Sequence, residues 1–295
     1  MPNTSASLST SAQRRRFAII NGDDFGFSRG VNQAIIQAYE QGVLTSTSLM
    51  VTGDAAEEAI TLARNHPNLA IGLHLVLVCG RSVLPPEQIP HLVDSKGNFL
   101  DSALQAGLRY QFQSAAYEEL RQEIRAQLEK FRDSGLPLSH LDGHLHLHAH
   151  PVILRILVEL AQEFDIRFIR LPSEELGMNL KLDSRELVTK LVWAAVFGRL
   201  RRYGEDLLIS HGIKFADKVY GLLQTGNMTE EYLLGLIPQI QADLVEIYSH
   251  PAVFNPGDVE LAALLSEQVR EVLNVNGFEL TNYHHRNIHS PKPLQ

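Results

Sequence analysis

The sequence FAIINGDDFG at residues 17–26 contains the strongest indication of the fold. It begins with an apolar run and ends with the neighbouring carboxylates Asp23 and Asp24, shortly before a helical pattern at residues 30–41. An apolar strand that leads directly into a helix is typical of parallel α/β sheets, in which the carboxyl ends of the strands form the rim of the active site. Taken alone, the two aspartates have two interpretations: a catalytic or metal-binding pair, or a turn with a helix N-cap.

Short apolar runs alternate with longer amphipathic runs along the rest of the chain. This order predicts a mostly parallel α/β sheet, and we expect a TIM-like (β/α) barrel that is distorted or incomplete. The predicted strands are residues 17–21, 46–51, 70–74, 139–142, 167–170 and 244–248. The predicted helices are residues 30–41, 55–65, 115–134, 151–164, 184–201, 229–239 and 259–274. Residues 79–114 have no clear period and contain several prolines, which indicates a long excursion above the sheet.

The chain is expected to form one domain. No repeat, low-complexity block or linker-like stretch divides it after residue 16. We therefore predict a single barrel domain at residues 17–295, preceded by a disordered tail at residues 1–16 that is rich in serine and threonine. Three arginines precede the apolar run at residues 17–20, but that run is much shorter than the roughly 7–15 apolar residues of a secretion signal.

Composition excludes several classes of function. The net charge of −8 argues against a general binder of nucleic-acid backbones, which usually presents a strong basic field. No stretch approaches the roughly 18 uninterrupted apolar residues of a membrane-spanning helix. A single cysteine, Cys79, excludes an internal disulfide and a cysteine-rich zinc motif, and it is compatible with a cytoplasmic location. Any metal ion must therefore be bound by histidines and carboxylates.

Histidines concentrate at the ends of two further predicted strands. His74 ends the apolar run at residues 71–74, and residues 140–148 read HLDGHLHLH. In an extended segment one face would carry every second residue: His140, Asp142, His144, His146 and His148. Burying so many imidazoles without partners would be costly, so the pattern favours a cation or a polar cavity over a histidine-rich edge strand. A catalytic metal site usually takes about three protein ligands, so we do not expect all of them to bind metal.

Two later predicted strands also end in polar side chains. His250, followed by Pro251, is suited to donate a proton near neutral pH, although a packing or capping histidine is an equally good interpretation. Arg170 could bind a carboxylate or a substrate oxygen through two hydrogen bonds, or form a surface salt bridge. Because the carboxyl ends of barrel strands share one mouth, we expect these features to converge.

Together these motifs resemble the YdjC-like carbohydrate deacetylases. The resemblance rests on four motifs in the same order: DDFG at 23–26, GLH at 72–74, HLDGH at 140–144 with His146 and His148, and SHPA at 249–252. It spans about residues 17–283, and the combined set is far more specific than any single motif. Among the branches of the family, the chain looks most like the one associated with hopanoid lipid biosynthesis.

The resemblance implies a hydrolase that removes the acetyl group from an N-acetylated amino sugar, in this branch an N-acetylglucosaminyl hopanoid lipid. It implies that Asp24, His74 and His144 bind one divalent ion, Mg²⁺ or Zn²⁺. Asp23 would then be the base and His250 the acid, although the roles of the two aspartates could be exchanged. The residues expected to support these groups or contact the substrate are Arg170, His146, His148 and Asp142.

Other functions remain open at this point. The chain could deacetylate chito-oligosaccharides, or be a metal-dependent phosphoesterase or amidohydrolase, since residues 146–148 mimic a His-x-His motif on a barrel strand. It could also be a non-catalytic sugar- or lipid-binding barrel with a structural metal. In that case the basic, apolar stretch at 191–202 could contact a membrane or a partner protein, unless it is a buried core helix. We expect a small-molecule sugar or glycolipid partner, no nucleic acid, at most peripheral membrane contact, and a homodimer.

Overall fold

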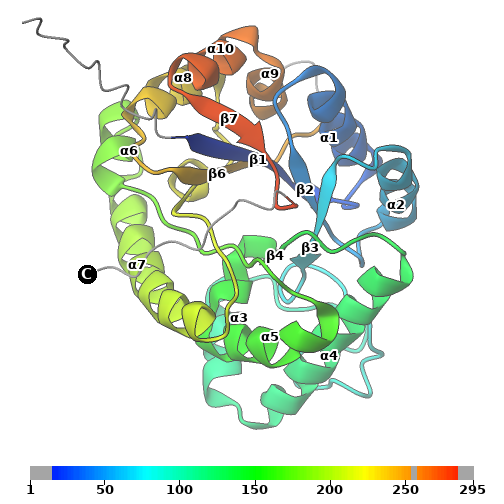
Figure 1. Ribbon diagram of the computed structural model, residues 1–295. Helices are drawn as coiled ribbons and strands as arrows, with labels where there is room; N and C mark the ends of the chain where they lie inside the picture. Colours follow the sequence, from blue (N-terminus) through cyan, green and yellow to red (C-terminus); the bar gives the residue numbers. More distant parts are fainter. Residues whose placement is uncertain (1–14, 254–257, 285–295) are drawn as a thin grey trace, which may run out of the picture.

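The computed structural model describes residues 15–253 and 258–284. Its centre is a curled parallel sheet that forms a half-barrel surrounded by helices (Figure 1). The strands are β1 (Arg16–Phe25), β2 (Ser46–Leu49), β3 (Ala70–Leu75), β4 (Leu141–Gly143), β5 (Lys218–Tyr220), β6 (Leu244–Ser249) and β7 (Phe278–Thr281). The predicted distorted TIM-like barrel is therefore confirmed. The predicted tail at 1–16 lies outside the described residues except for Arg15 and Arg16, and Arg16 already belongs to β1.

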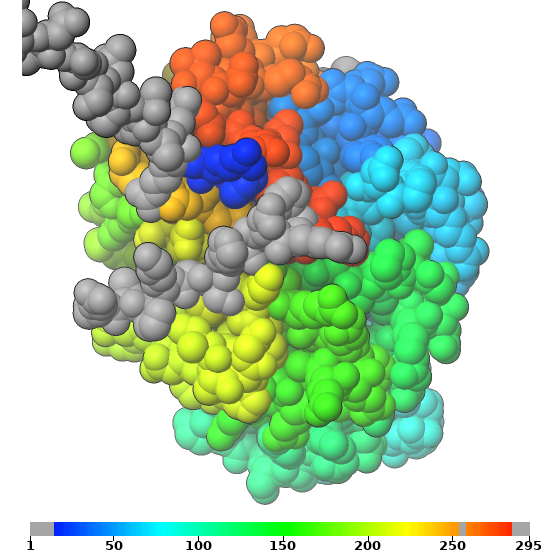
Figure 2. Space-filling view, viewed as in Figure 1, coloured from blue at the N-terminus to red at the C-terminus, as the bar shows by residue number. Residues whose placement is uncertain are grey.

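The order of the strands explains the distortion of the barrel. Six strands follow the order β4-β3-β2-β1-β6-β5, and β7 pairs with β1 outside this path. On one edge of β1, residues 17–22 pair with β6. On the other edge of β1, residues 16–19 pair with β7 and residues 21–25 pair with β2. The strand β7 thus occupies the space where β2 diverges from the start of β1. Figure 2 shows the blue start of β1 beside the red and orange segments near the C-terminus.

One predicted strand, at residues 167–170, forms only isolated bridges. Leu141 is bridged to Ile169, and Phe168 to Lys214, which continues the curl of the sheet beyond β4. The segment cannot lengthen into a regular strand because Pro172 follows it closely and lacks the N–H group that a ladder requires.

Ten α-helices lie in the described part of the chain. They are α1 (Arg29–Gln41), α2 (Ala56–Asn65), α3 (Ala103–Phe112), α4 (Ala115–Asp133), α5 (Pro151–Phe164), α6 (Leu176–Leu182), α7 (Leu187–Ser210), α8 (Glu230–Leu236), α9 (Val259–Leu265) and α10 (Glu267–Val275). The 3₁₀ helices are η1 (His144–Ala149), η2 (Leu222–Gln224) and η3 (Ile237–Gln239). None of the described helices combines the length and the apolar character needed to cross a bilayer.

The helix patterns in the sequence were mostly sufficient to place the helices. In α1, Ser28 accepts a hydrogen bond from the backbone N–H of Val31, and Val31, Ile35 and Ala38 form the buried face at helical spacing. The predicted helix at 259–274 is instead divided into α9 and α10, because the Ser266 hydroxyl caps α10. The unpredicted α3 lies within the excursion at 79–114, and α6, β5 and β7 were also not predicted.

Candidate metal centre and active site

The two aspartates at the end of β1 point to different partners. Asp24 has a left-handed backbone conformation, with φ of 65°, and the register between β1 and β2 shifts between Gly22 and Phe25. Such a bulge changes the direction of successive side chains, and a left-handed conformation is uncommon for residues other than glycine. Asp23 consequently contacts Arg170 on one side, while Asp24 contacts two histidines on the other.

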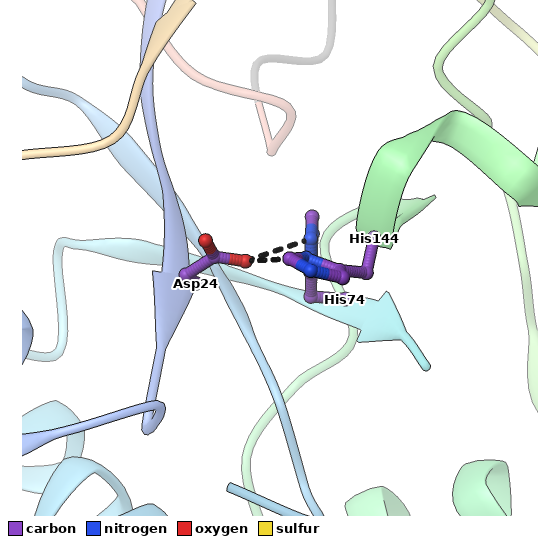
Figure 3. A group of neighbouring side chains, drawn as sticks. All are labelled: Asp24, His74 and His144. Carbon is purple, nitrogen blue, oxygen red and sulfur yellow. Dashed lines mark hydrogen bonds and ion pairs between the residues drawn. The ribbon is translucent and has the colours of Figure 1, made fainter. Parts of the chain in front are cut away.

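Asp24, His74 and His144 come together from three segments of the sheet rim (Figure 3). Oδ1 of Asp24 lies 3.1 Å from Nε2 of His74 and 3.0 Å from Nδ1 of His144. One ligand atom from each residue lies within 4.8 Å of the others. These are the three residues that the sequence predicted as a metal-binding set, on β1, on β3 and at the start of η1.

The donor set and its supports fit a divalent cation. Nδ1 of His74 lies 2.8 Å from Oδ1 of Asp142, which turns Nε2 toward Asp24. A carboxylate on the remote nitrogen is the usual partner of a metal-binding imidazole. One carboxylate and two imidazoles suit a borderline ion such as Zn²⁺ and are compatible with other divalent ions.

The charges around these groups are strongly coupled. Burial opposes protonation of His74, but Asp142 and Asp24 outweigh burial and raise its pKa to about 10. Burial would raise the pKa of Asp24, yet hydrogen bonds to His144 and His74 hold it well below its ordinary value. The centre therefore keeps carboxylates ionised around buried rings, which is the electrostatic environment that a bound cation favours.

Arg170 lies fully buried beneath this centre. Its Nη1 and Nη2 lie 2.7 and 2.8 Å from the two oxygens of Asp23, and Nη2 also lies 2.8 Å from Oδ2 of Asp142. Its Nε donates to Oε1 of Glu246 at 2.7 Å. Direct contact between Arg170 and substrate, one of the roles considered from the sequence, is therefore wrong: the side chain is 0% exposed and its donors are occupied by three carboxyl groups. It instead orients Asp23.

His250 follows β6 and reaches the same region. Its Nε2 lies 4.0 Å from Oδ2 of Asp23, and its side chain is 31% exposed. On the other side, Oε2 of Glu260 accepts a hydrogen bond from the backbone N–H of His250 and lies 3.9 Å from Nδ1. The imidazole is thus held between a buried carboxylate and a second carboxylate on α9, with one side open to the cleft.

The extended face predicted for residues 140–148 is wrong. β4 ends at Gly143, and the chain enters η1 with left-handed φ values at Leu145 and His146. Alternate residues therefore do not share one face. The ring of His140 stacks on Tyr283, and burial lowers its pKa to about 3. The His-x-His pair at 146–148 is consequently not on a barrel strand, which removes the geometric basis for the phosphoesterase or amidohydrolase interpretation.

The remaining two histidines of this segment, His146 and His148, are buried beside the site. Nε2 of His146 lies 2.6 Å from the hydroxyl of Tyr248, and Nε2 of His148 lies 2.9 Å from the carbonyl oxygen of Arg170. Burial lowers the pKa of His146 well below its ordinary value and that of His148 to about 4, so both rings are neutral near neutral pH. His146 lines the cleft, whereas His148 packs behind it.

A cleft of about 530 Å³ opens above these residues. Its floor contains Asp23, His74, Gly143, His146 and His250, and its walls come from the start of α3, the N-terminal end of α7 and residues 222–227. The sequence interpretation missed Glu246, Tyr248 and Glu260. A signal was present for the first two, because residues 246, 248 and 250 alternate along β6 and point toward one side of the strand.

Comparison with known proteins finds a family model and relatives that match most of this chain. The model of the family described as YdjC-like protein matches residues 17–275. A carbohydrate deacetylase from Brevibacillus brevis is 34% identical, over 90% of this chain and 94% of that protein. A carbohydrate deacetylase from Clostridium beijerinckii is 30% identical, over 90% of this chain and 98% of its own length.

A solved structure shows the same fold. The crystal structure of an Enterococcus faecalis protein, described as a candidate cellobiose-phosphate cleavage protein, is 27% identical and superposes with a TM-score of 0.69. The match covers 91% of this chain and 98% of that one. The family match and the two relatives confirm the family predicted from the sequence motifs. This chain belongs to the YdjC-like protein family.

Proposed function

We propose that this chain removes the acetyl group from an N-acetylated amino sugar by metal-dependent hydrolysis of the acetamide. The observation that carries the proposal is the convergence of the cluster of Asp24, His74 and His144 with Asp23 and His250 at one cleft. The names of the curated relatives, both carbohydrate deacetylases, support the same reaction class.

In this proposal Asp24, His74 and His144 bind one divalent ion, with Zn²⁺ and Mg²⁺ as the candidates. Such an ion supplies Lewis acidity, which lowers the pKa of water and stabilises negative charge on the acetyl oxygen. Asp142 fixes the orientation of the His74 ring through Nδ1. The left-handed conformation at Asp24 directs its carboxylate toward the two rings.

Asp23 and His250 are the proposed proton-transfer pair. Asp23 lines the cleft, and its carboxylate is aligned by two hydrogen bonds from Arg170 and one from Asn21. It would accept the proton of the attacking water. His250 lies 4.0 Å away and is partly exposed to the cleft, so it can deliver a proton to the leaving nitrogen, without which an amide leaves poorly.

For the substrate we propose an N-acetylglucosaminyl lipid, with a hopanoid carrier in the branch that the sequence resembles. Support comes from apolar side chains at the entrance of the cleft, Leu104, Leu145 and Trp193, beside its polar floor. Chito-oligosaccharides are the alternative substrate. A cytoplasmic location and a homodimer remain predictions.

The test is release of free acetate by enzyme supplied with Zn²⁺ or Mg²⁺, from N-acetylglucosaminyl lipids and from chito-oligosaccharides. Asp23→Asn is expected to lose the activity, because removal of a general base typically costs about 10²–10⁴-fold in rate. Asp165→Asn, at an exposed helix end, is the matched control and should retain it. Undiminished acetate release by Asp23→Asn would refute the assigned base. Release of phosphate from a sugar phosphate without acetate release from any acetylated sugar would favour a phosphoesterase.

A further inference from the structure

One face of α3 is apolar and uncovered. Leu104, Leu108 and Phe112 follow each other at intervals of four residues, so they lie along one stripe of the helix. Their exposed fractions are 73%, 51% and 79%. An amphipathic helix in a folded protein normally turns such a stripe toward the core, but α3 buries Ala106 and Tyr110 instead.

The N-terminal half of α7 has the same property. Six large apolar residues in this half are exposed: Leu187, Val188, Leu191, Val192, Trp193 and Val196. The buried residues of the helix are Lys190 and Phe197 in its first half and Arg201, Gly204 and Leu208 in its second half. A monomeric protein seldom exposes so many neighbouring apolar side chains without a binding role.

These two faces border the same cleft. Leu104 of α3 and Trp193 of α7 line the same cleft as Asp23 and His250. The exposed apolar residues of α3 and of the first half of α7 therefore extend from two walls of one cleft, and together they are here called the α3–α7 apolar surface. Any partner that covers this surface also lies at the entrance of the active-site cleft.

The charge around the α3–α7 apolar surface is opposite to that of the whole protein. Residues 181–202 contain six basic and two acidic side chains, whereas the chain carries a net charge of −8. Lys181, Arg199 and Arg202 are exposed and form no ion pair with another described residue. Helical spacing places Arg199 on the face that carries Val188 and Val192.

We propose that the α3–α7 apolar surface docks onto an anionic lipid bilayer and places the entrance of the cleft at the membrane. Apolar side chains with a tryptophan, bordered by cations, are the combination that binds to the interface of anionic membranes. A second copy of the chain fits less well, because a symmetric contact would bring the same cations together. The substrate class that follows, an N-acetyl sugar carried on a lipid, rests on the proposed function.

The experiment measures flotation of the full-length protein with lipid vesicles, which needs no turnover and so can fail independently of the proposed reaction. The wild type is expected to float with vesicles of phosphatidylcholine and phosphatidylglycerol, and much less with phosphatidylcholine alone. Val188→Glu with Val192→Glu, and separately Leu108→Glu with Phe112→Glu, should each weaken binding by more than about tenfold. Arg199→Gln with Arg202→Gln should weaken it by about tenfold and reduce its sensitivity to salt.

Val275→Glu on α10 is the matched control, because Val275 is 76% exposed and lies on a helix remote from α7 (Figure 1). It should float like the wild type. Circular dichroism and thermal unfolding establish that each variant is folded. Because the α3 pair and the α7 pair of substitutions are independent, the proposal can still be tested if one of the two variants does not fold. Absence of flotation with anionic vesicles, or equal flotation of folded surface variants and wild type, would overturn the proposal. A dimer that the same substitutions dissociate, without vesicle binding, would identify a second copy as the occupant.

Discussion

Replacing Glu246 with glutamine removes one of the three carboxyl groups that surround the buried guanidinium of Arg170. Burial raises the pKa of the Glu246 carboxyl to about 7, and this effect outweighs the opposing influence of Arg170. The same guanidinium also contacts Asp23 and Asp142, so a single cation faces three buried acids. Glutamine keeps the shape of the side chain and can still accept a hydrogen bond from Nε of Arg170.

The size of the change in stability follows from the pKa values of the Glu246 carboxyl in the unfolded and in the folded protein. A carboxyl whose pKa rises from 4.5 to about 7 on folding binds more protons in the folded state over that interval. The contribution of Glu246 to the free energy of unfolding therefore falls by about 3 kcal/mol as pH rises from 4.5 to about 7. Glu246→Gln lacks this contribution. We expect the variant to match the wild type near pH 4.5 and to be more stable by about 3 kcal/mol above pH 7.

The assay is urea unfolding of both proteins across this pH range, in the presence of a chelator so that bound metal does not contribute. Histidines with shifted pKa values add their own pH dependence to both proteins, so the difference between the two curves isolates Glu246. Glu279→Gln, at an exposed glutamate of β7, controls for the loss of a negative charge. If the free energies of unfolding of the wild type and of Glu246→Gln changed with pH in parallel, the inference that burial forces the Glu246 carboxyl toward its neutral form would be refuted.

Two further substitutions test the packing and the support of the site. Gly72→Ala should destabilise the protein by about 1–3 kcal/mol in urea unfolding, because a Cβ atom at residue 72 would lie 2.4–2.6 Å from the ring of His140. Gly198→Ala, where a Cβ meets no atom within 4 Å, should instead be neutral or stabilising; equal effects of the two changes would contradict the packing argument. Asp142→Asn should weaken Zn²⁺ binding by about 10–100-fold in calorimetric titration, because it weakens the interaction that orients His74; unchanged affinity would show that this contact does not support the ion.

The sequence predicted the positions of the site residues better than their environments. Apolar runs followed by polar residues located the ends of β1, β3, β4 and β6, because the carboxyl ends of parallel strands must meet at one rim. The different directions of Asp23 and Asp24 depend on the bulge between β1 and β2, which is set by pairing with a distant strand. No local pattern encodes that register.

The incorrect and missed predictions from the sequence have equally specific causes. Strict alternation at residues 140–148 predicts an extended segment, but contacts such as that between His148 and the carbonyl of Arg170 favour the turn into η1. The strands β5 and β7 contain only three and four residues, too few for a reliable alternation. Arg170 was found by its position at a strand end, yet its burial depends on three acids from other parts of the chain.

The central claim is that Asp24, His74 and His144 bind one divalent ion next to the floor of the cleft, to which His74 belongs. Elemental analysis of protein incubated with Zn²⁺ and then desalted tests it directly. One ion per chain is expected for the wild type, and none for a variant that combines His74→Ala with His144→Ala. His211→Ala with His66→Ala, two histidines remote from the cluster, should keep the ion. Full metal content in the His74 and His144 double variant, with its fold intact by circular dichroism, would contradict the proposed metal centre.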